Sequence, residues 1–216
     1  MRFCSLALLQ FSFFSGRASQ TRVRLMMSSS SAYPTGINPD GTLRDYPMPV
    51  PQTPACIAAS TGDADFLRSI GEADLLAPEE SSGNTPLIWA ADRGHTRALE
   101  VILESVERQD QSSVNARGYI GNTALSRAAR GGHLDCVKAL LAATLIDPNI
   151  PNEKMQYPLH FAAYKRHAGV VQALLSASAC STMVTDRKGR TPAEDTKDEA
   201  IRSMILAARS AGGKAV

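Results

Sequence analysis

The sequence is poor in the residue patterns on which catalytic and metal sites depend. Its four cysteines, Cys4, Cys56, Cys136 and Cys180, are far apart and form no Cys-x-x-Cys pair, so neither a zinc motif nor a redox motif is present. The HExxH, GxSxG, GxxxxGKS/T and GxGxxG motifs are also missing. These absences predict a protein that is not an enzyme and that holds neither a metal nor a cofactor.

Long hydrophobic runs are absent as well. The longest apolar-rich stretch, residues 3–14, is interrupted by Ser5, Gln10 and Ser12, whereas a membrane-spanning helix needs about 20 apolar residues. We therefore expect no transmembrane helix. The formal net charge of +2 argues against a chain built to wrap nucleic acid.

The N-terminal segment, residues 1–39, contains no acidic residue, four arginines and eight serines. Such a composition is typical of mitochondrial or plastid transit peptides, and we expect the segment to be a targeting sequence that is removed. Arg2 and the short apolar run after it also suit a secretory signal, and the two features together resemble a bipartite plastid leader. We expect a plastid or mitochondrial protein; a cytoplasmic protein with an unprocessed tail and a secreted protein are the alternatives.

The next residues, 40–52, are predicted to be a proline-rich linker, since six prolines fall between Tyr33 and Pro54 with little periodic apolar content. Folding is expected to begin near Thr53 and to end near residue 208. Residues 209–216 are expected to be a disordered tail.

A seven-residue phrase recurs through the predicted folded region. The full copies read Thr53-Pro-Ala-Cys-Ile-Ala-Ala59, Thr85-Pro-Leu-Ile-Trp-Ala-Ala91, Thr123-Ala-Leu-Ser-Arg-Ala-Ala129 and Tyr157-Pro-Leu-His-Phe-Ala-Ala163, and Thr191-Pro-Ala193 begins a shortened fifth. The starts, at residues 53, 85, 123, 157 and 191, lie 32, 38, 34 and 34 residues apart. A fixed period of this length indicates stacked repeats.

Each phrase reads as the start of a helix. Threonine caps free amides, and proline at the first helical position gives up an amide that has no helical partner. The paired alanines allow close helix packing, and a glycine three residues later, as at Gly62, Gly94 and Gly132, permits a tight turn. A second helix with one apolar stripe follows in the inner copies; its stripe is Ala98, Leu99, Ile102 and Leu103, then Leu134, Val137, Leu140 and Leu141, then Val170, Val171, Leu174 and Leu175.

Spacing near 33 residues together with a Thr-Pro-Leu-His-x-Ala-Ala phrase resembles the ankyrin repeat, over residues 53–208. The resemblance implies an all-α solenoid of about five stacked helix-turn-helix units, joined by hairpin loops and closed by terminal caps. It also implies that partner proteins bind a concave face made by the hairpin tips and the first helices.

Several residues depart from the repeat pattern. Arg166 stands where the turn glycine belongs, at a cost of roughly 1 kcal/mol if its backbone is left-handed. Ala124 replaces the helix-starting proline. About five extra residues separate the second and third copies, and we expect them to enlarge a loop within residues 104–113. Glu79 and Glu80 are expected to be solvated in a loop.

The histidines and aromatic residues are explained by the repeat. His95, His133 and His167 share one position, and we expect all four histidines, including His160, to hydrogen-bond loop backbone. Trp89 and Phe161 also share a position and are predicted to lie in the core, whereas Tyr119 is predicted to be an exposed anchor at a loop tip.

Charge divides the repeats into two halves. Residues 53–111 hold 11 acidic and 4 basic residues, and residues 112–190 hold 10 basic and 4 acidic ones. This split reflects either ordinary solvated faces or a basic partner-facing surface. The resemblance places partner-binding residues at the hairpin tips and on the first helices. The residues that we predict to bind a partner are Arg117, Tyr119, Ile120, Asn122, Arg130, Lys154, Gln156, Tyr164, Lys165, Arg187, Lys188 and Arg190. Glu153 is a further tip position, and Asp92 and Arg93 are further helix positions.

Basic and aromatic residues dominate this set, so the expected partner is a protein, through an acidic segment, and not a small molecule. Nucleic acid or an anionic membrane surface is one alternative, and a scaffold for an organellar complex is another. We expect the protein to be a monomer.

Overall fold

The computed structural model describes residues 49–177 and 179–210, all of which belong to one compact unit. In the described ranges every regular element is a helix, which confirms an all-α repeat fold. The expected targeting segment and most of the expected linker lie outside the described residues, as do residues 211–216. The α-helices are α1 (Pro54–Thr61), α2 (Ala64–Ser69), α3 (Glu72–Leu76), α4 (Pro86–Arg93), α5 (Thr96–Gln109), α6 (Ala124–Gly131), α7 (Leu134–Ala142), α8 (Pro158–Tyr164), α9 (Ala168–Ser176), α10 (Pro192–Asp195) and α11 (Glu199–Ser210), with short 3-10 helices η1 (Gln111–Asn115) and η2 (Tyr119–Gly121).

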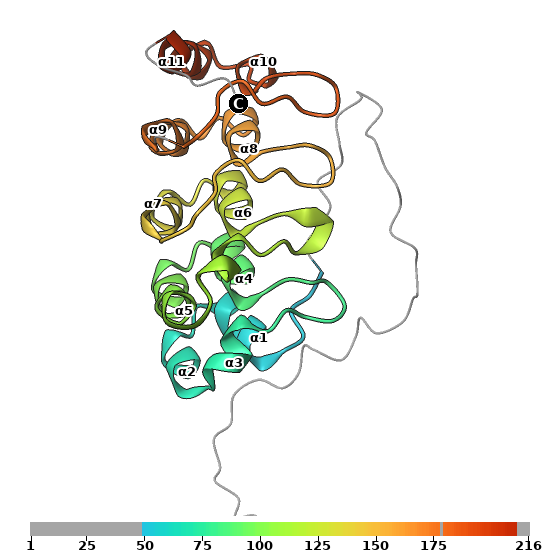
Figure 1. Cartoon of the computed structure of the whole chain (residues 1–216), viewed down its shortest axis with the longest axis vertical. Coiled ribbons are helices and arrows are strands. Elements are labelled where there is room, and N and C mark those ends of the chain that lie inside the picture. Colours follow the sequence, from blue (N-terminus) through green and yellow to red (C-terminus); the bar gives the residue numbers. More distant parts are fainter. Residues whose placement is uncertain (1–48, 178, 211–216) are drawn as a thin grey trace, which may run out of the picture. The chain divides into compact units, whose positions relative to one another are not determined.

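The helices form two stacked columns, and the hairpin loops project to one side of them (Figure 1). One column holds the first helix of each repeat, α1, α4, α6, α8 and α10, and each of these contacts the next. The other column holds α2, α5, α7, α9 and α11, again in successive contact. Each repeat therefore buries its apolar residues against its neighbours, as a solenoid must.

The first helices begin one residue after the start of each phrase. The side chains of Thr53, Thr85 and Thr123 accept hydrogen bonds from the amides of Cys56, Ile88 and Ser126, at 3.2, 3.4 and 3.2 Å. The cap at Thr123 has the same geometry as the others although alanine follows it. The threonine cap thus suffices to start α6 without a proline, whereas α8 begins at Pro158 after Tyr157, without a side-chain cap.

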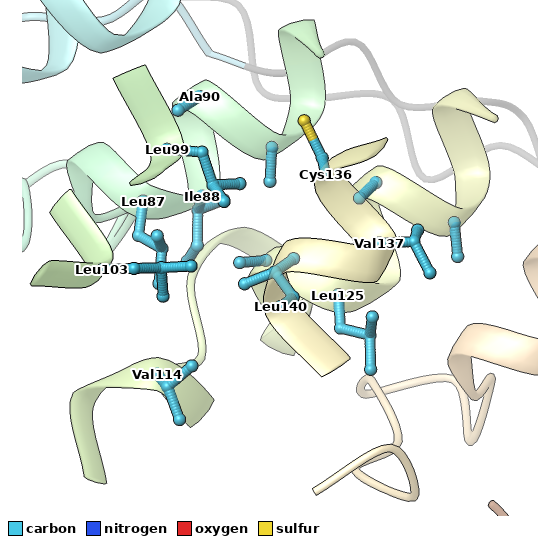
Figure 2. Close-up of a cluster of buried hydrophobic side chains, with 14 of the residues drawn as sticks. Leu87, Ile88, Ala90, Leu99, Leu103, Val114, Leu125, Cys136, Val137 and Leu140 are labelled. Atoms are coloured by element: carbon cyan, nitrogen blue, oxygen red, sulfur yellow. The ribbon is translucent and has the colours of Figure 1, made fainter. Parts of the chain in front are cut away.

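The core is a continuous layer between the two columns. Both phrase alanines are buried in each of the four full copies, which brings neighbouring first helices close together. Figure 2 shows how side chains of successive repeats meet in the second and third repeats. Those that it labels are Leu87, Ile88 and Ala90 of α4, Leu99 and Leu103 of α5, Val114 of η1, Leu125 of α6, and Cys136, Val137 and Leu140 of α7.

The expected loop enlargement within residues 104–113 is wrong, because the extra residues lengthen α5 instead. This helix runs for 14 residues to Gln109. Val106 is 2% exposed and continues the apolar stripe of Ile102 and Leu103. The end of the helix is held by Glu72 of α3, which accepts a hydrogen bond from Gln109 at 2.6 Å and pairs with Arg108 at 3.3 Å.

The loop histidines join each turn to the turn before it. His95 Nε2 lies 3.0 Å from the Ser60 carbonyl oxygen, and His133 and His167 contact the carbonyls of Asp92 and Arg130 in the same way. His160 Nε2 lies 3.0 Å from the Arg190 carbonyl oxygen. The predicted backbone role of the histidines is confirmed.

Arg166 adopts the left-handed backbone of the glycine that it replaces, with φ 62°. At the equivalent Gly62, Gly94 and Gly132 a β-carbon would lie within 2.8 Å of the next repeat's histidine. No histidine follows His167 in the sequence. A side chain is therefore sterically possible at residue 166, although its backbone conformation remains unfavourable.

Two further sequence expectations can be compared with the structure. Trp89 is fully buried, as predicted, but Phe161 is only partly buried, so its assignment to the core is wrong in part. In the described ranges, no helix combines the length and the hydrophobicity that crossing a membrane requires.

Candidate protein-interaction surface

Three hairpin loops, which we call the tip loops, carry most of the predicted partner-binding residues. They comprise residues 116–122, 152–156 and 186–190. Each is closed by a backbone hydrogen bond: from the Gly118 amide to the Asn122 carbonyl at 3.0 Å, and from Asn152 to Gln156 and Asp186 to Arg190, both at 2.9 Å.

Hydrogen bonds also link neighbouring tip loops to one another. The Glu153 amide donates to the Ile120 carbonyl at 3.1 Å. Arg187 contacts the same loop twice, through its amide to the Lys154 carbonyl at 3.4 Å and through Nη2 to the Glu153 carbonyl at 2.7 Å. Residues tens of positions apart in sequence therefore lie side by side along the tips.

The basic residues of the tip loops differ in availability. Arg117, Arg187 and Lys188 are exposed, and Lys154 is half-buried. Arg190, whose side chain is 40% exposed, is paired with the carboxylates of Asp186 and Asp195, each 2.7 Å from its guanidinium. Its charge is thus balanced within the fold, and it contributes less to a basic surface than the sequence suggests.

Burial removes one residue from the predicted surface. Asn122 is 6% exposed; its Nδ2 donates to the Tyr119 carbonyl at 3.0 Å, and its Oδ1 accepts from Asn152 at 3.3 Å. This side chain joins successive tip loops, and its burial leaves little of it for a partner to contact. Gln156, half-buried, accepts from the same Asn152 at 3.3 Å.

Tyr119 and Ile120 form the 3-10 turn of the first tip loop. Both are partly exposed, and the Tyr119 amide is held by the buried Asn84 side chain at 2.9 Å. A β-carbon at Gly118 would meet this Asn84 oxygen at 2.2 Å, so the close approach requires glycine. Ile120 follows with φ 59° and ψ 25°, in the left-handed region.

The predicted positions on the first helices lie at or beside their C-terminal ends. Arg93 is exposed, Asp92 and Arg130 are half-exposed, and Tyr164 is 45% exposed. Lys165 Nζ lies 5.8 Å from the centre of the Tyr164 ring, within the range of a cation–π contact. These residues belong to α4, α6 and α8, which contact one another in order.

Arg127 is a structural residue that the sequence interpretation missed. It is 1% exposed, with Nη1 3.7 Å from the Asp92 carboxylate and Nη2 3.4 Å from the Tyr119 carbonyl. It therefore stabilises the first tip loop through the backbone of Tyr119. Its place in the phrase, the same as that of Trp89 and Phe161, was the available signal.

Glu79 is buried, at 2% exposure, so the expectation that it is solvated is wrong. Burial acts to raise the pKa of this carboxyl, but hydrogen bonds from Gln52, Ser82, Thr53 and Trp89 outweigh it and lower the pKa. The shortest joins the Gln52 amide to Oε1 at 2.6 Å. The carboxylate therefore joins the start of the folded region, at Gln52 and Thr53, to Ser82 and Trp89 of the second repeat.

The chemistry of the described residues suits binding. Burial raises the pKa of the Cys56 and Cys180 thiols to about 12, so they are protonated near neutral pH and are poor nucleophiles. Among residues 49–177 and 179–210, no three His, Cys, Asp or Glu side chains cluster closely enough to hold a metal. What the tips do present is cationic and apolar side chains.

Comparison with protein families agrees with this architecture. A family model described as ankyrin repeats in three copies matches residues 55–152. A second, described as ankyrin repeats in many copies, matches residues 140–194. Together the two matches cover the repeats from α1 to α10.

Curated relatives match part of this chain and differ in name. The E3 ubiquitin-protein ligase XBAT33 of Arabidopsis thaliana is 31% identical over 125 residues, covering 56% of this chain and 23% of that protein. The ankyrin repeat-containing protein ITN1 of the same plant is 33% identical over 114 residues, covering 44% and 19%. The mitochondrial glutaminase liver isoform of Rattus norvegicus is 31% identical over 119 residues, covering 55% and 19%. The matches thus span about a quarter of these relatives or less.

Proposed function

Because the chain belongs to the ankyrin repeat family, we propose that its repeats bind an acidic segment of a partner protein and catalyse no reaction themselves. The binding surface consists of the tip loops and the exposed residues at the ends of α6 and α8. The observation that carries this proposal is the set of exposed cations on the first and third tip loops, Arg117, Arg187 and Lys188.

The relatives support a binding role without catalysis. One is named a ubiquitin ligase and another a glutaminase, yet each matches about half of this chain, over 125 and 119 residues. One kind of repeat segment cannot account for two unrelated reactions. The shared segment is more simply explained as an interaction module, since a fold alone fixes no chemistry.

The charge of the surface indicates the class of partner. The tip loops carry Arg117, Lys154, Arg187 and Lys188 against the single exposed carboxylate of Glu153, because Asp186 is buried in its pair with Arg190. Arginine beside tyrosine contributes strongly to protein interfaces. An acidic protein segment complements both properties.

Charge reversal tests this surface. In a triple variant, Arg130→Glu, Lys165→Glu and Lys188→Glu, we expect capture of partners from an extract to be lost while the circular dichroism spectrum and melting temperature stay near wild type. Reversal adds repulsion as well as removing attraction. The matched control reverses Arg97, Lys138 and Arg209 on α5, α7 and α11, which changes net charge equally on the other column. If the triple variant still retrieves the same partners, or if the control also fails, the assigned surface is wrong.

Two further measurements separate the alternatives. Binding to any polyanion, with a steep dependence on salt, would identify a nucleic-acid or membrane-surface binder instead. Co-purification with an organellar complex in fixed stoichiometry would identify a scaffold.

A further inference from the structure

We propose that the side chains of Ile120 and Met155 form an apolar anchor site among the tip-loop cations, and that this site selects acidic segments carrying a large apolar or aromatic side chain. The inference rests on the proposed function and specifies its ligand. It follows from two residues whose side chains stand where the backbone favours glycine.

Both residues are left-handed, Ile120 with φ 59° and Met155 with φ 59°. Met155 lies two residues before its phrase, a position held in the other hairpins by Gly83, Gly121 and Gly189, all with positive φ. Ile120 is β-branched, the side-chain type least compatible with this region. Glycine would adopt either conformation without strain.

Core packing does not explain these side chains. Met155 is 44% exposed and Ile120 is partly exposed, and neither belongs to the buried core. Met155 thus strains its backbone with little gain from burial, and Ile120 strains its backbone without joining the core. Strained residues of this kind cluster at binding sites, where their contribution is made with a ligand.

The two residues lie on neighbouring tip loops. The hydrogen bond from the Glu153 amide to the Ile120 carbonyl, 3.1 Å, joins the loops side by side. Arg117 Nε contacts the Gly121 carbonyl at 3.4 Å, and Arg187 Nη2 contacts the Glu153 carbonyl at 2.7 Å. A guanidinium nitrogen therefore contacts the backbone of each loop, one residue from Ile120 in the first and two residues from Met155 in the second.

This combination favours one ligand class. Cations alone would suit any polyanion, including nucleic acid, but phosphate contacts gain nothing from exposed isoleucine and methionine side chains. Carboxylates spaced around an apolar residue can use both features. Methionine in particular adapts its shape to varied apolar partners.

Leu145 provides an internal control. It is also left-handed, with φ 61°, and is 62% exposed, but it lies in the loop after α7. Replacing it with glycine relieves the same kind of strain and removes an exposed apolar side chain of similar size. It leaves the tip loops unchanged.

The test compares two soluble probes, polyglutamate and a random copolymer of glutamate and tyrosine of equal length, by titration at fixed salt. We expect the wild-type full chain to bind the copolymer about tenfold more tightly than polyglutamate. The double variant Ile120→Gly, Met155→Gly should lose this preference and melt no lower than wild type. Leu145→Gly should keep the preference.

Equal affinity of the wild type for the two probes, or a preference that survives in the double variant, would overturn the anchor site. If polyglutamate binding remains and disappears on charge reversal of Arg130, Lys165 and Lys188, the proposed function stands even when the anchor fails. If neither probe binds, or an RNA homopolymer competes equally with the copolymer, the acidic-segment proposal fails with it. Met155→Asn, which tolerates left-handed backbone, replaces the double variant if that protein unfolds.

Discussion

The imidazole of His133 lies so close to Gly94 that a β-carbon on the glycine would stand 2.4 Å from Nδ1. The Nε2 atom of the same ring lies 3.1 Å from the Asp92 carbonyl oxygen. Gly62 and Gly132 stand in the same relation to His95 and His167. The turn glycines therefore serve two purposes, a left-handed backbone and space for the next repeat's histidine.

Gly94→Ala is expected to lower the free energy of unfolding by roughly 2–5 kcal/mol, from the left-handed backbone and the steric overlap together. In a His133→Ala background the same substitution should cost only about 1–2 kcal/mol, because the backbone term alone remains. Urea denaturation of the four proteins in this double-mutant cycle gives the coupling. Equal costs in both backgrounds would mean that the histidine does not pack on the glycine.

Leu140→Ala is expected to cost about 2–5 kcal/mol through the cavity it leaves. Leu140 is fully buried in α7, whereas Leu206 of α11 is 43% exposed and serves as the control. Leu206→Ala should change stability by less than about 0.5 kcal/mol. Chemical denaturation measures both, and a small effect at Leu140 would contradict the repeat register.

Glu79→Gln should reduce stability by about 1–3 kcal/mol at neutral pH, because the amide nitrogen that replaces Oε2 cannot accept from Ser82 and Trp89. The lowered pKa sets the sign of the pH dependence. The stabilisation from the carboxylate is complete above the pKa of an unfolded glutamate and is lost as the pH falls through the lowered folded pKa. The wild type and the variant should therefore converge in acid, and a gap that widens below pH 4 would contradict this role.

Removal of residues 1–39 is expected to leave the helical signal and the melting temperature nearly unchanged, since this acid-free, serine-rich segment precedes the repeats. Removal of residues 1–53 is the contrasting variant. It deletes the Gln52 and Thr53 amides that Glu79 accepts from and the Thr53 cap of α1. Loss of such a cap costs about 1 kcal/mol, so this protein should melt lower. A large loss of cooperativity in the shorter deletion would show that the segment belongs to the fold.

The fold could be predicted from the sequence because each repeat carries its own signals. Thr85-Pro86 marks a helix start by local chemistry, and the spacing of Val137 and Leu140 marks a buried stripe, both without knowledge of distant residues. The lengthened α5 could not be predicted in this way. Val106 joins the core through packing of α5 on α3, which depends on a tertiary contact.

The candidate surface was less predictable than the fold. Exposed cations such as Arg187 follow from the repeat register alone. Asn122 does not, because its burial depends on Asn152 of the next repeat, 30 residues away. The left-handed Met155 could have been found, since its position before the phrase is occupied by glycine elsewhere. Ile120 offers no such signal, because glycine follows it directly in the same loop.

The contacts of the three loop histidines point in one direction along the chain. His95, His133 and His167 each reach back to a carbonyl made earlier in synthesis, on Ser60, Asp92 and Arg130. In a nascent chain each of these three histidines is therefore made after the turn that it contacts, so each repeat can dock on one made earlier. The stack can therefore assemble from its N-terminal repeat onward during translation.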